Sequence, residues 1–422
     1  MLRRTLADWL EWQERLHPVE IELGLERVRA VLAAMGLARP ACTVVTVGGT
    51  NGKGSCVAVV EALGLKAGLR VGAYTSPHLQ RYNERVRVAG REVSDEELVA
   101  AFETVETARG ETSLSYFEYG TAAALEIFRR REVELAVLEV GLGGRLDAVN
   151  AIDPQVAVVT SVGLDHLEWL GPDRESIGRE KGGIFRPGRP AVIGDRRPPS
   201  SLLEAAGVDA LRLGIDFDWV NDHAGWTWRK GDRVLHGLPR AALAAPALRD
   251  NAACALAAFD ALWPLESAET AREALADIRL PGRLQRVPGE VEWWFDVAHN
   301  PDGAEVLAGA LVAAAAPRRT FAVLGMLADK DAAGVAAALD RCVDQWFTAS
   351  LPPPRGLSAE ALAACIASHV RGPVSGCASV EAACRRARDQ ARPGDRIVVF
   401  GSFHAVGPAL GWLEVYCAPQ TR

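Results

Sequence analysis

The chain has 422 residues, of which 49% are hydrophobic and 24% charged. This length and composition predict two or three globular domains and exclude a disordered or fibrous chain, and no apolar run reaches the ~18 to 20 residues of a membrane helix. The net charge of −7 without a long basic block argues against a nucleic-acid surface, and 8 scattered cysteines without a C-x-x-C pair favour reduced thiols in the cytoplasm.

Apolar segments of strand length alternate with helix-length periodic segments in the first part of the chain. The expected strands cover 43–47, 71–75, 135–140 and 156–161, and the expected helices cover 55–67, 95–108 and a segment starting near Tyr119. A capping box, Ser94-x-x-Glu97, opens the second helix. This alternation predicts βαβ units with a mostly parallel sheet, which binds ligands at the carboxyl ends of its strands.

The segment 211–235 differs because it carries three tryptophans among alternating polar residues, and it predicts antiparallel strands on a sheet edge. Helices are expected at 247–263 and 268–278. Two Pro-Gly pairs then predict a domain boundary, with domains at 1–284 and 291–422 and a linker at 285–290. A second βα series, with strands near 292–297, 321–325, 344–348 and 396–400, predicts a smaller Rossmann-like α/β domain.

A glycine-rich turn, Gly49-Thr-Asn-Gly-Lys-Gly-Ser55, connects the first strand to a helix. Backbone N–H groups of such a turn cradle phosphates, the helix N-terminus favours anions, and Lys53 can neutralise phosphate oxygens. The turn departs from the common G-x-x-x-x-G-K-[ST] pattern by a glycine between Lys53 and Ser55. The alternative is a structural turn with an exposed lysine, but the strand–turn–helix order favours a phosphate-binding loop in a P-loop ATPase-like domain.

Oxygen-bearing residues follow the other expected strands. Glu139 ends an almost wholly apolar strand, so its carboxylate must be paired, protonated or bound to a metal. Mg²⁺ is the simplest partner for this carboxylate beside a nucleotide-binding loop, and Ser76 offers a further oxygen to bind it. His166 also follows a strand, although histidine is an unusual magnesium ligand and a structural role stays open.

Three further places carry polar residues whose meaning local pattern leaves open. Lys181 ends a helix-like segment that breaks at two glycines, and taken alone it indicates a solvated lysine or a phosphate contact. The glycine-dense loop 140–148 contains Arg145 and Asp147 and predicts a mobile loop that reaches a ligand. In the second domain, polar residues end two strands, at Asp296 with His299 and at Ser402 with His404.

Taken together, these motifs resemble the Mur-ligase superfamily and, within it, the bifunctional dihydrofolate synthase/folylpolyglutamate synthase family. The resemblance covers nearly the whole chain. It rests on the segments Gly49–Ser55, Thr75–Leu79, Glu84–Arg87, Tyr116–Glu118, Leu138–Ala148, Gly171–Lys181, Leu280–Arg283 and Phe295–Pro301.

The resemblance implies an ATP-dependent ligase with two magnesium positions. ATP is expected at Thr50, Asn51, Gly52, Lys53, Gly54 and Ser55, and from the far side of a cleft at Asn251, Arg283 and Asp296. The metal positions are Ser76, Glu139 and His166. The family's lysine at the position of Lys181 is carbamylated, which converts a cation into a carboxylate-like ligand, and His299 and Ser402 match positions near the incoming glutamate. Lys53, Lys181, His299 and Ser402 are therefore the expected catalytic residues.

The acceptor site is implied in the same way. The matching dihydropteroate positions are Glu22, Leu23, Gly24, Leu25, Ser115, Tyr116, Phe117, Glu118, Leu146, Asp147 and Ala148. The departures are small and include Gly48 before the loop, Cys56 after it, Gly182 after Lys181 and Asp250 before Asn251. They affect fine geometry at the nucleotide and the lysine rather than the reaction class.

The implied reaction joins L-glutamate to dihydropteroate and to reduced folates through an acyl phosphate. The expected partners are these small molecules, with no nucleic acid and no membrane, and the expected state is a monomer. The alternatives are a monofunctional folylpolyglutamate synthase, a ligase acting on a cell-wall precursor, and a P-loop ATPase that drives a protein partner. The last leaves Asp296, His299 and Ser402 unexplained.

Overall fold

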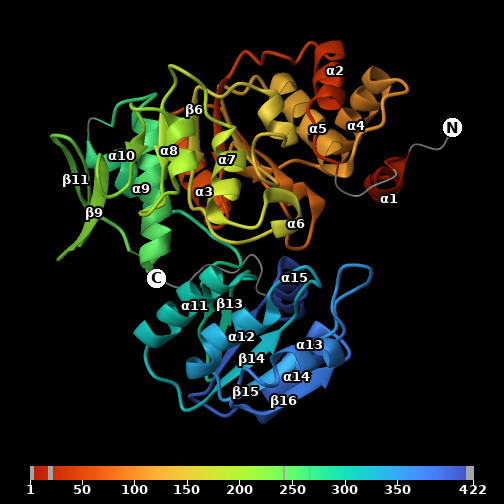
Figure 1. Cartoon of the computed structure of the whole chain (residues 1–422), viewed down its shortest axis with the longest axis vertical. Helices are drawn as coiled ribbons and strands as arrows, with labels where there is room; N and C mark the ends of the chain where they lie inside the picture. The colour runs from red at the N-terminus through yellow and green to blue at the C-terminus, as the bar shows by residue number, and fades with distance from the viewer. Residues whose placement is uncertain (1–3, 18–21, 241–242, 266, 415–422) are drawn as a thin grey trace. The chain divides into compact units, whose positions relative to one another are not determined.

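The computed structural model describes residues 4–17, 22–240, 243–265 and 267–414, and the chain divides into two compact units, Met1–Ile278 and Arg279–Arg422. Figure 1 shows both as layered α/β structures. The expected fold class is confirmed: the first unit carries a mostly parallel sheet, and the second unit is smaller and also α/β. No helix among the described residues is long and apolar enough to cross a membrane.

An eight-stranded sheet in the order β4-β3-β2-β5-β1-β6-β7-β8 forms the centre of the first unit. The six strands from β2 to β8 in that order run parallel, while β3 and β4 are antiparallel additions at one edge. The strands are β1 (Thr43–Gly48), β2 (Val71–Tyr74), β3 (Val86–Val88), β4 (Arg91–Glu92), β5 (Leu135–Glu139), β6 (Val156–Val159), β7 (Ala191–Ile193) and β8 (Leu211–Arg212).

In the first unit, α3, α5 and α9 pack against this sheet, and α1, α2, α4 and α5 gather beside one another (Figure 1). Side-chain caps start several of them, because the first N–H groups of a helix need acceptors: Ser94 caps α4 and Ser115 caps α5, each in a reciprocal capping box. The helices are α1 (Leu6–Leu16), α2 (Glu26–Ala34), α3 (Lys53–Lys66), α4 (Asp95–Arg109), α5 (Tyr116–Arg130), α6 (Leu167–Leu170), α7 (Arg174–Gly182), α8 (Ser200–Ala206), α9 (Pro246–Asp260) and α10 (Ala268–Ala276).

The tryptophan-rich segment differs from the expectation of strands on the main sheet edge. Only β8 joins that sheet, and a separate antiparallel sheet β11-β10-β9 is formed by β9 (Phe217–Asp222), β10 (Gly225–Lys230) and β11 (Arg233–Leu238). Trp226 and Trp228 on β10 are fully buried. Contacts of β9 with α9 and of β11 with α10 give this small sheet its own apolar partner, so it needs no place on the large one.

The second unit contains a six-stranded sheet in the order β12-β13-β17-β14-β15-β16, parallel except for β12. The segment expected as linker, 285–290, contains β12, because this strand hydrogen-bonds along β13 at the sheet edge. The strands are β12 (Gln285–Val287), β13 (Glu292–Phe295), β14 (Thr320–Leu324), β15 (Gln345–Ala349), β16 (Val374–Cys377) and β17 (Arg396–Phe400). The helices are α11 (Pro301–Ala313), α12 (Ala332–Leu339), α13 (Ala359–Ile366), α14 (Val380–Gln390) and α15 (Phe403–Trp412).

Candidate active site

The glycine-rich turn after β1 has the backbone of a phosphate-binding loop. Gly49 and Gly52 adopt φ angles of +139° and +88°, which L side chains rarely take. Both are also in close contact: a Cβ on Gly49 would lie 2.0 Å from Thr160 Oγ1, and a Cβ on Gly52 would lie 2.3 Å from Asn251 Oδ1. The chain can follow this path only with glycine at both positions.

The loop is tied to the strand end beside it. The Asn51 N–H donates to Ser161 Oγ at 3.0 Å, and Thr50 Oγ1 accepts from the Gly163 N–H at 2.9 Å. Lys53 is the first residue of α3, and its ammonium donates to the carbonyls of Gly49 and Thr50 at 3.0 and 3.2 Å. The lysine therefore folds back over the loop, where it can exchange these carbonyls for phosphate oxygens. Gly54 and Ser55 continue the first turn of α3.

The sequence analysis expected Asn251 across a cleft from the loop. The structure places it in the same unit as the loop. It belongs to α9, which packs against α3, so its amide contacts Gly52 directly. Its neighbour Asp250 accepts hydrogen bonds from Arg196 and from the Trp219 indole, at 2.7 Å each. Packing between two helices thus brings Asn251 to the nucleotide loop.

The strand ends next to the loop carry the candidate metal ligands. Glu139 ends β5 in register with Val47 of β1, its side chain is buried, and its Oε2 accepts from the Ser76 N–H at 3.0 Å. Ser76 follows β2, the strand on the other side of β5. The described residues contain no group of three or more His, Cys, Asp or Glu suited to a metal. One carboxylate and one hydroxyl still fit Mg²⁺ at an ATP site, because Mg²⁺ takes few protein oxygens there and completes its shell with phosphate and water.

His166 follows the end of β6 in a left-handed backbone conformation, with φ of +52°, at the start of α6. Its backbone N–H donates to Asp165 Oδ1 at 2.9 Å, and its Nε2 lies 4.0 Å from the same oxygen. This unusual backbone is sterically costly for a non-glycine residue and is typical of functional turns.

The environment of Lys181 differs from the solvated one that local pattern favours, because its side chain is almost completely buried at the end of α7. Burial, with a further contribution from the nearby positive charge of Lys53, lowers the pKa of Lys181 to about 7, while Asp165 and Asp147 oppose that shift. The solvated lysine that local pattern favours is therefore excluded. The fold instead places Lys181 among charged groups from the loop and from two strand ends.

The glycine-dense loop after β5 is held by Asp147. Its two oxygens accept from the N–H groups of Gly141, Leu142 and Val149 at 3.0, 2.8 and 3.1 Å. Burial raises the pKa of Asp147 to about 7, although these backbone donors favour the charged carboxylate. The expected mobile loop is thus anchored by the carboxylate that the resemblance assigns to the acceptor. Leu146 and Ala148 flank that anchor.

The expected acceptor segments lie together. The Phe117 ring contacts Gly141, where an added Cβ would lie 2.7 Å from the ring, and the Tyr74 and Phe117 ring centroids lie 5.8 Å apart. Tyr116 is further along the same wall and packs edge-on against Tyr82, with a centroid distance of 5.8 Å. The start of α5 and the loop 141–148 are therefore in direct contact through Phe117 and Gly141.

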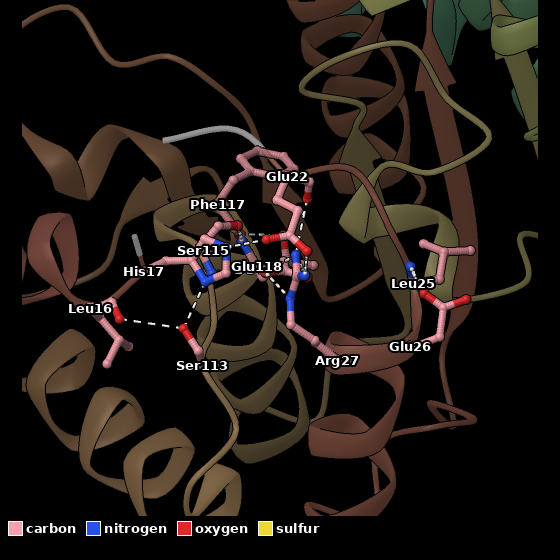
Figure 2. A network of polar contacts seen from close by, with 11 residues as sticks. Leu16, His17, Glu22, Leu25, Glu26, Arg27, Ser113, Ser115, Phe117 and Glu118 are labelled. Carbon is pink, nitrogen blue, oxygen red and sulfur yellow. Dashed lines mark hydrogen bonds and ion pairs between the residues drawn. The ribbon is translucent and has the colours of Figure 1, made fainter. Parts of the chain in front are cut away.

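A charged network connects α5 to the segment that begins with Glu22 and contains Leu23, Gly24 and Leu25 (Figure 2). Arg27 pairs with the Glu22 carboxylate, donates to the Glu22 carbonyl at 3.1 Å and donates to Glu118 Oε2 at 3.3 Å. Glu118 Oε2 also accepts from the Ser115 N–H at 2.8 Å, the cap position of α5. Arg27 thus joins two of the expected acceptor segments, which are far apart in sequence.

In the second unit, Asp296 fixes the end of β13. Its oxygens accept from the N–H groups of Leu284 and Ala298, both at 2.8 Å. Burial raises the pKa of Asp296 to about 6, and the charges of Arg283 and His299 oppose the shift. The guanidinium of Arg283 lies 5.3 Å from the centroid of the Phe403 ring. Three expected site residues of the second unit therefore lie close to one another: Asp296, Arg283 and His299.

His299 and Ser402 have different local roles. His299 Nδ1 lies 2.9 Å from the Val297 carbonyl, which can only accept, so Nδ1 carries the proton and Nε2 is the basic nitrogen of the neutral ring. Ser402 is buried; its hydroxyl donates to the Gly325 carbonyl at 2.9 Å and accepts from the Ala405 N–H at 3.1 Å as the cap of α15. Its proton is committed to that carbonyl, so Ser402 shapes the strand end and is poorly placed to react.

Two residues of the site lie outside the sequence predictions. Arg27 lies two positions after the expected acceptor residue Leu25, but no local pattern shows that it pairs with Glu118. His17 contacts Glu22 and Ser113 and has no sequence signal at all, because a single histidine after a helix is most often structural. Only a tertiary contact could have identified either of them.

Two family models and several curated proteins match this chain. The model of the Mur ligase middle domain matches residues 47–216, and that of the Mur ligase, glutamate ligase domain, matches residues 282–403. The chain is 46% identical to the dihydrofolate synthase/folylpolyglutamate synthase of Escherichia coli (strain K12), over 95% of this chain and 94% of that one. It is 37% identical to the protein of the same description from Haemophilus influenzae, over 95% and 96%.

Solved structures are similar over almost the whole chain. One is Escherichia coli FolC in complex with DHPP and ADP, with a TM-score of 0.92, 44% identity and 98% of each chain covered. Another is a bifunctional folylpolyglutamate synthase/dihydrofolate synthase with Mn, AMPPNP and L-glutamate bound, with a TM-score of 0.90, 44% identity and coverage of 97% and 98%. The likeness thus extends over both units.

Proposed function

The chain belongs to the dihydrofolate synthase/folylpolyglutamate synthase family of Mur ligases, and from this premise we propose that it catalyses both reactions of that name. It joins L-glutamate to dihydropteroate, making dihydrofolate, and to reduced folates, making folylpolyglutamates. The observation that carries the proposal is the juxtaposition of Lys53, Glu139 and the Phe117–Asp147 surface in one unit. A nucleotide loop and an acceptor surface at the same sheet are what an ATP-dependent ligase requires.

The reaction must activate a carboxylate, because an amine does not displace oxygen from an unactivated one. The γ-phosphoryl group of ATP passes to an oxygen of the acceptor carboxylate, which releases ADP and leaves an acyl phosphate. The α-amine of glutamate then adds to the carbonyl carbon and loses a proton, and the C–O bond breaks to release phosphate. Lys53 and the N–H groups of the first residues of α3, up to Ser55, would offset charge on the transferred oxygens.

Mg²⁺ would be held by Ser76 and Glu139 at one position and by His166 at a second. It supplies charge neutralisation for phosphate oxygens when bound. The chain's own residues orient the rest of ATP: Asn251 lies against Gly52, and we assign Arg283 and Asp296 to the nucleotide as well. His299 Nε2 is the nitrogen that would accept the proton from the glutamate amine, and Ser402 would support that site by fixing the strand end.

Lys181 would be carbamylated. Its neutral amine adds to the carbon of CO₂ and loses a proton, giving a carbamate whose oxygens can serve as metal ligands. Two observations support this: the side chain is buried among polar strand ends, and its pKa is lowered to about 7, so the reactive neutral amine is available near neutral pH. A permanently charged lysine beside Lys53 would repel it instead.

The test is ADP release by the pure protein with ATP, Mg²⁺ and glutamate, offering dihydropteroate in one reaction and a tetrahydrofolate in another. Turnover with both supports the bifunctional assignment. Turnover with tetrahydrofolate alone would reduce it to a folylpolyglutamate synthase, the second candidate. Turnover with neither would contradict both.

We further propose that the enzyme acts as a monomer in the cytoplasm, with no nucleic-acid or membrane partner. Light scattering of the active protein tests whether it is a monomer.

A further inference from the structure

His17 lies where the first helix ends, and it contacts Glu22, an acceptor residue of the proposed function, and Ser113, which lies just before the acceptor segment that starts at Ser115. Its side chain is only 7% exposed. One ring nitrogen, Nδ1, lies 2.7 Å from Ser113 Oγ, and the other, Nε2, lies 2.6 Å from Glu22 Oε2. Figure 2 shows the ring between these two groups, one from the segment before α2 and one from the loop before α5.

Proton counting fixes how this contact works. An ionised carboxylate can only accept, so Nε2 must donate to Glu22. The hydrogen bond from His17 also lowers the pKa of Glu22, ahead of the contribution of Arg27, so Glu22 stays ionised. With Nε2 as the donor, Nδ1 of the neutral ring accepts from the Ser113 hydroxyl, whose oxygen also lies 3.4 Å from the Leu16 carbonyl. The ring is therefore held at both nitrogens.

Glu22 passes this constraint to Arg27 and Glu118. One carboxylate oxygen of Glu22 is bound by His17 and the other by Arg27, so the carboxylate cannot turn without breaking a charge-assisted bond. Arg27 in turn holds Glu118 Oε2. Glu118 is buried, and its second oxygen, Oε1, lies 3.2 Å from Arg27 Nη2 but has no hydrogen bond among the described residues. The ion pair with Arg27 therefore fixes the orientation of this buried carboxylate at the start of α5.

We propose that His17 is a positioning residue for the acceptor, acting through Glu22 and Arg27 to hold the Glu118 carboxylate in place at the start of α5. This inference rests on the proposed function. Because both ring nitrogens of His17 contact protein groups, its loss is expected to change acceptor affinity and to leave the phosphoryl and acyl steps intact.

The experiment measures dihydrofolate synthesis by the full-length enzyme with each substrate varied in turn. His17→Leu is expected to raise the KM for dihydropteroate about tenfold, as for one lost charge-assisted hydrogen bond, with kcat and the KM values for ATP and glutamate within about twofold of the parent. His17→Gln retains an N–H donor that can reach Glu22 and is expected to restore most of the affinity. His17→Asn is too short to reach Glu22 and should behave like His17→Leu.

Matched controls separate positioning from folding. His223→Leu changes an exposed histidine of the small antiparallel sheet and should leave every parameter unchanged. If His17→Leu does not fold, the comparison of His17→Gln with His17→Asn carries the test. An unchanged dihydropteroate KM in the Leu and Asn variants, or an equal rise in all three KM values, would overturn the proposal. A parent enzyme that turns over neither acceptor would instead contradict the proposed function.

Discussion

At Lys181, burial and a neighbouring cation act in the same direction on one residue. The side chain sits inside the first unit, where water cannot solvate an ammonium, and Lys53 adds repulsion. Both effects favour the neutral amine that carbamylation needs, so the local electrostatics and the proposed modification agree.

Replacement of this lysine should therefore be rescued chemically. Lys181→Ala is expected to lower kcat by about 100-fold or more, the range lost when a group that stabilises transition-state charge is removed. Acetate or formate should restore part of it by supplying a carboxylate in the space left. Steady-state ADP release with increasing carboxylate measures the rescue. A variant with normal kcat would remove Lys181 from the site.

The pH dependence of the modification has a defined sign. Because the pKa of Lys181 is lowered to about 7, the neutral fraction increases as pH rises through that value, and only the neutral amine adds to CO₂. We expect the carbamate signal from ¹³C-bicarbonate to grow between about pH 6 and about pH 8. NMR of the labelled protein measures this signal. Lys181→Arg should give no such signal. A signal that is equal at both pH values would contradict the assignment.

At the scale of elements, the β1–α3 connection combines two constraints on its glycines. Gly52 needs a positive φ, and it also leaves space for the Asn251 amide of α9. Gly68, just beyond the other end of α3, has a similar φ of +80° but no atom within 4 Å of an added Cβ. A substitution at Gly68 therefore tests backbone strain alone, whereas one at Gly52 tests strain together with close packing.

Gly52→Ala is expected to lower both stability and ATP binding, whereas Gly68→Ala is expected to lower stability alone. Both Gly52→Ala and Gly68→Ala are expected to lower the free energy of unfolding by about 1 kcal/mol because of the left-handed backbone. Only Gly52→Ala should also abolish measurable ATP binding, since its methyl group displaces the Asn251 amide from the loop. Calorimetric titration with ATP and thermal unfolding compare the two variants. Equal ATP affinity in both would show that the contact with Asn251 is unimportant.

At the scale of the whole molecule, each unit has a sheet and a core of its own. The second unit buries a continuous cluster around Leu307, Trp346 and Phe400 under helices on its own sheet. It has about the usual size of an independent domain.

The second unit should consequently fold alone. A fragment of residues 279–422 is expected to show a mixed α/β circular dichroism spectrum and a single cooperative thermal transition, and to release no ADP, because the nucleotide loop belongs to the other unit. The full chain is the control. A fragment without a cooperative transition would show that this core depends on the first unit.

The sequence alone determined what is local. The strand, glycine turn and helix around Lys53 are contiguous, so their residue types suffice to predict them, and period and capping residues located most strands and helices for the same reason. The family, and with it the ligase reaction, followed from such contiguous motifs in order.

Tertiary structure alone decided what depends on residues far apart in the chain. It turned Lys181 from a solvated lysine into a buried one, moved Asn251 to the loop's own unit, gave the tryptophan-rich strands a separate sheet, and used the Ser402 hydroxyl as a helix cap. Arg27 and Glu118 are separated by 91 positions, and no local pattern encodes their contact. Burial and pairing set the protonation and reach of these groups, and both exist only once the chain has packed.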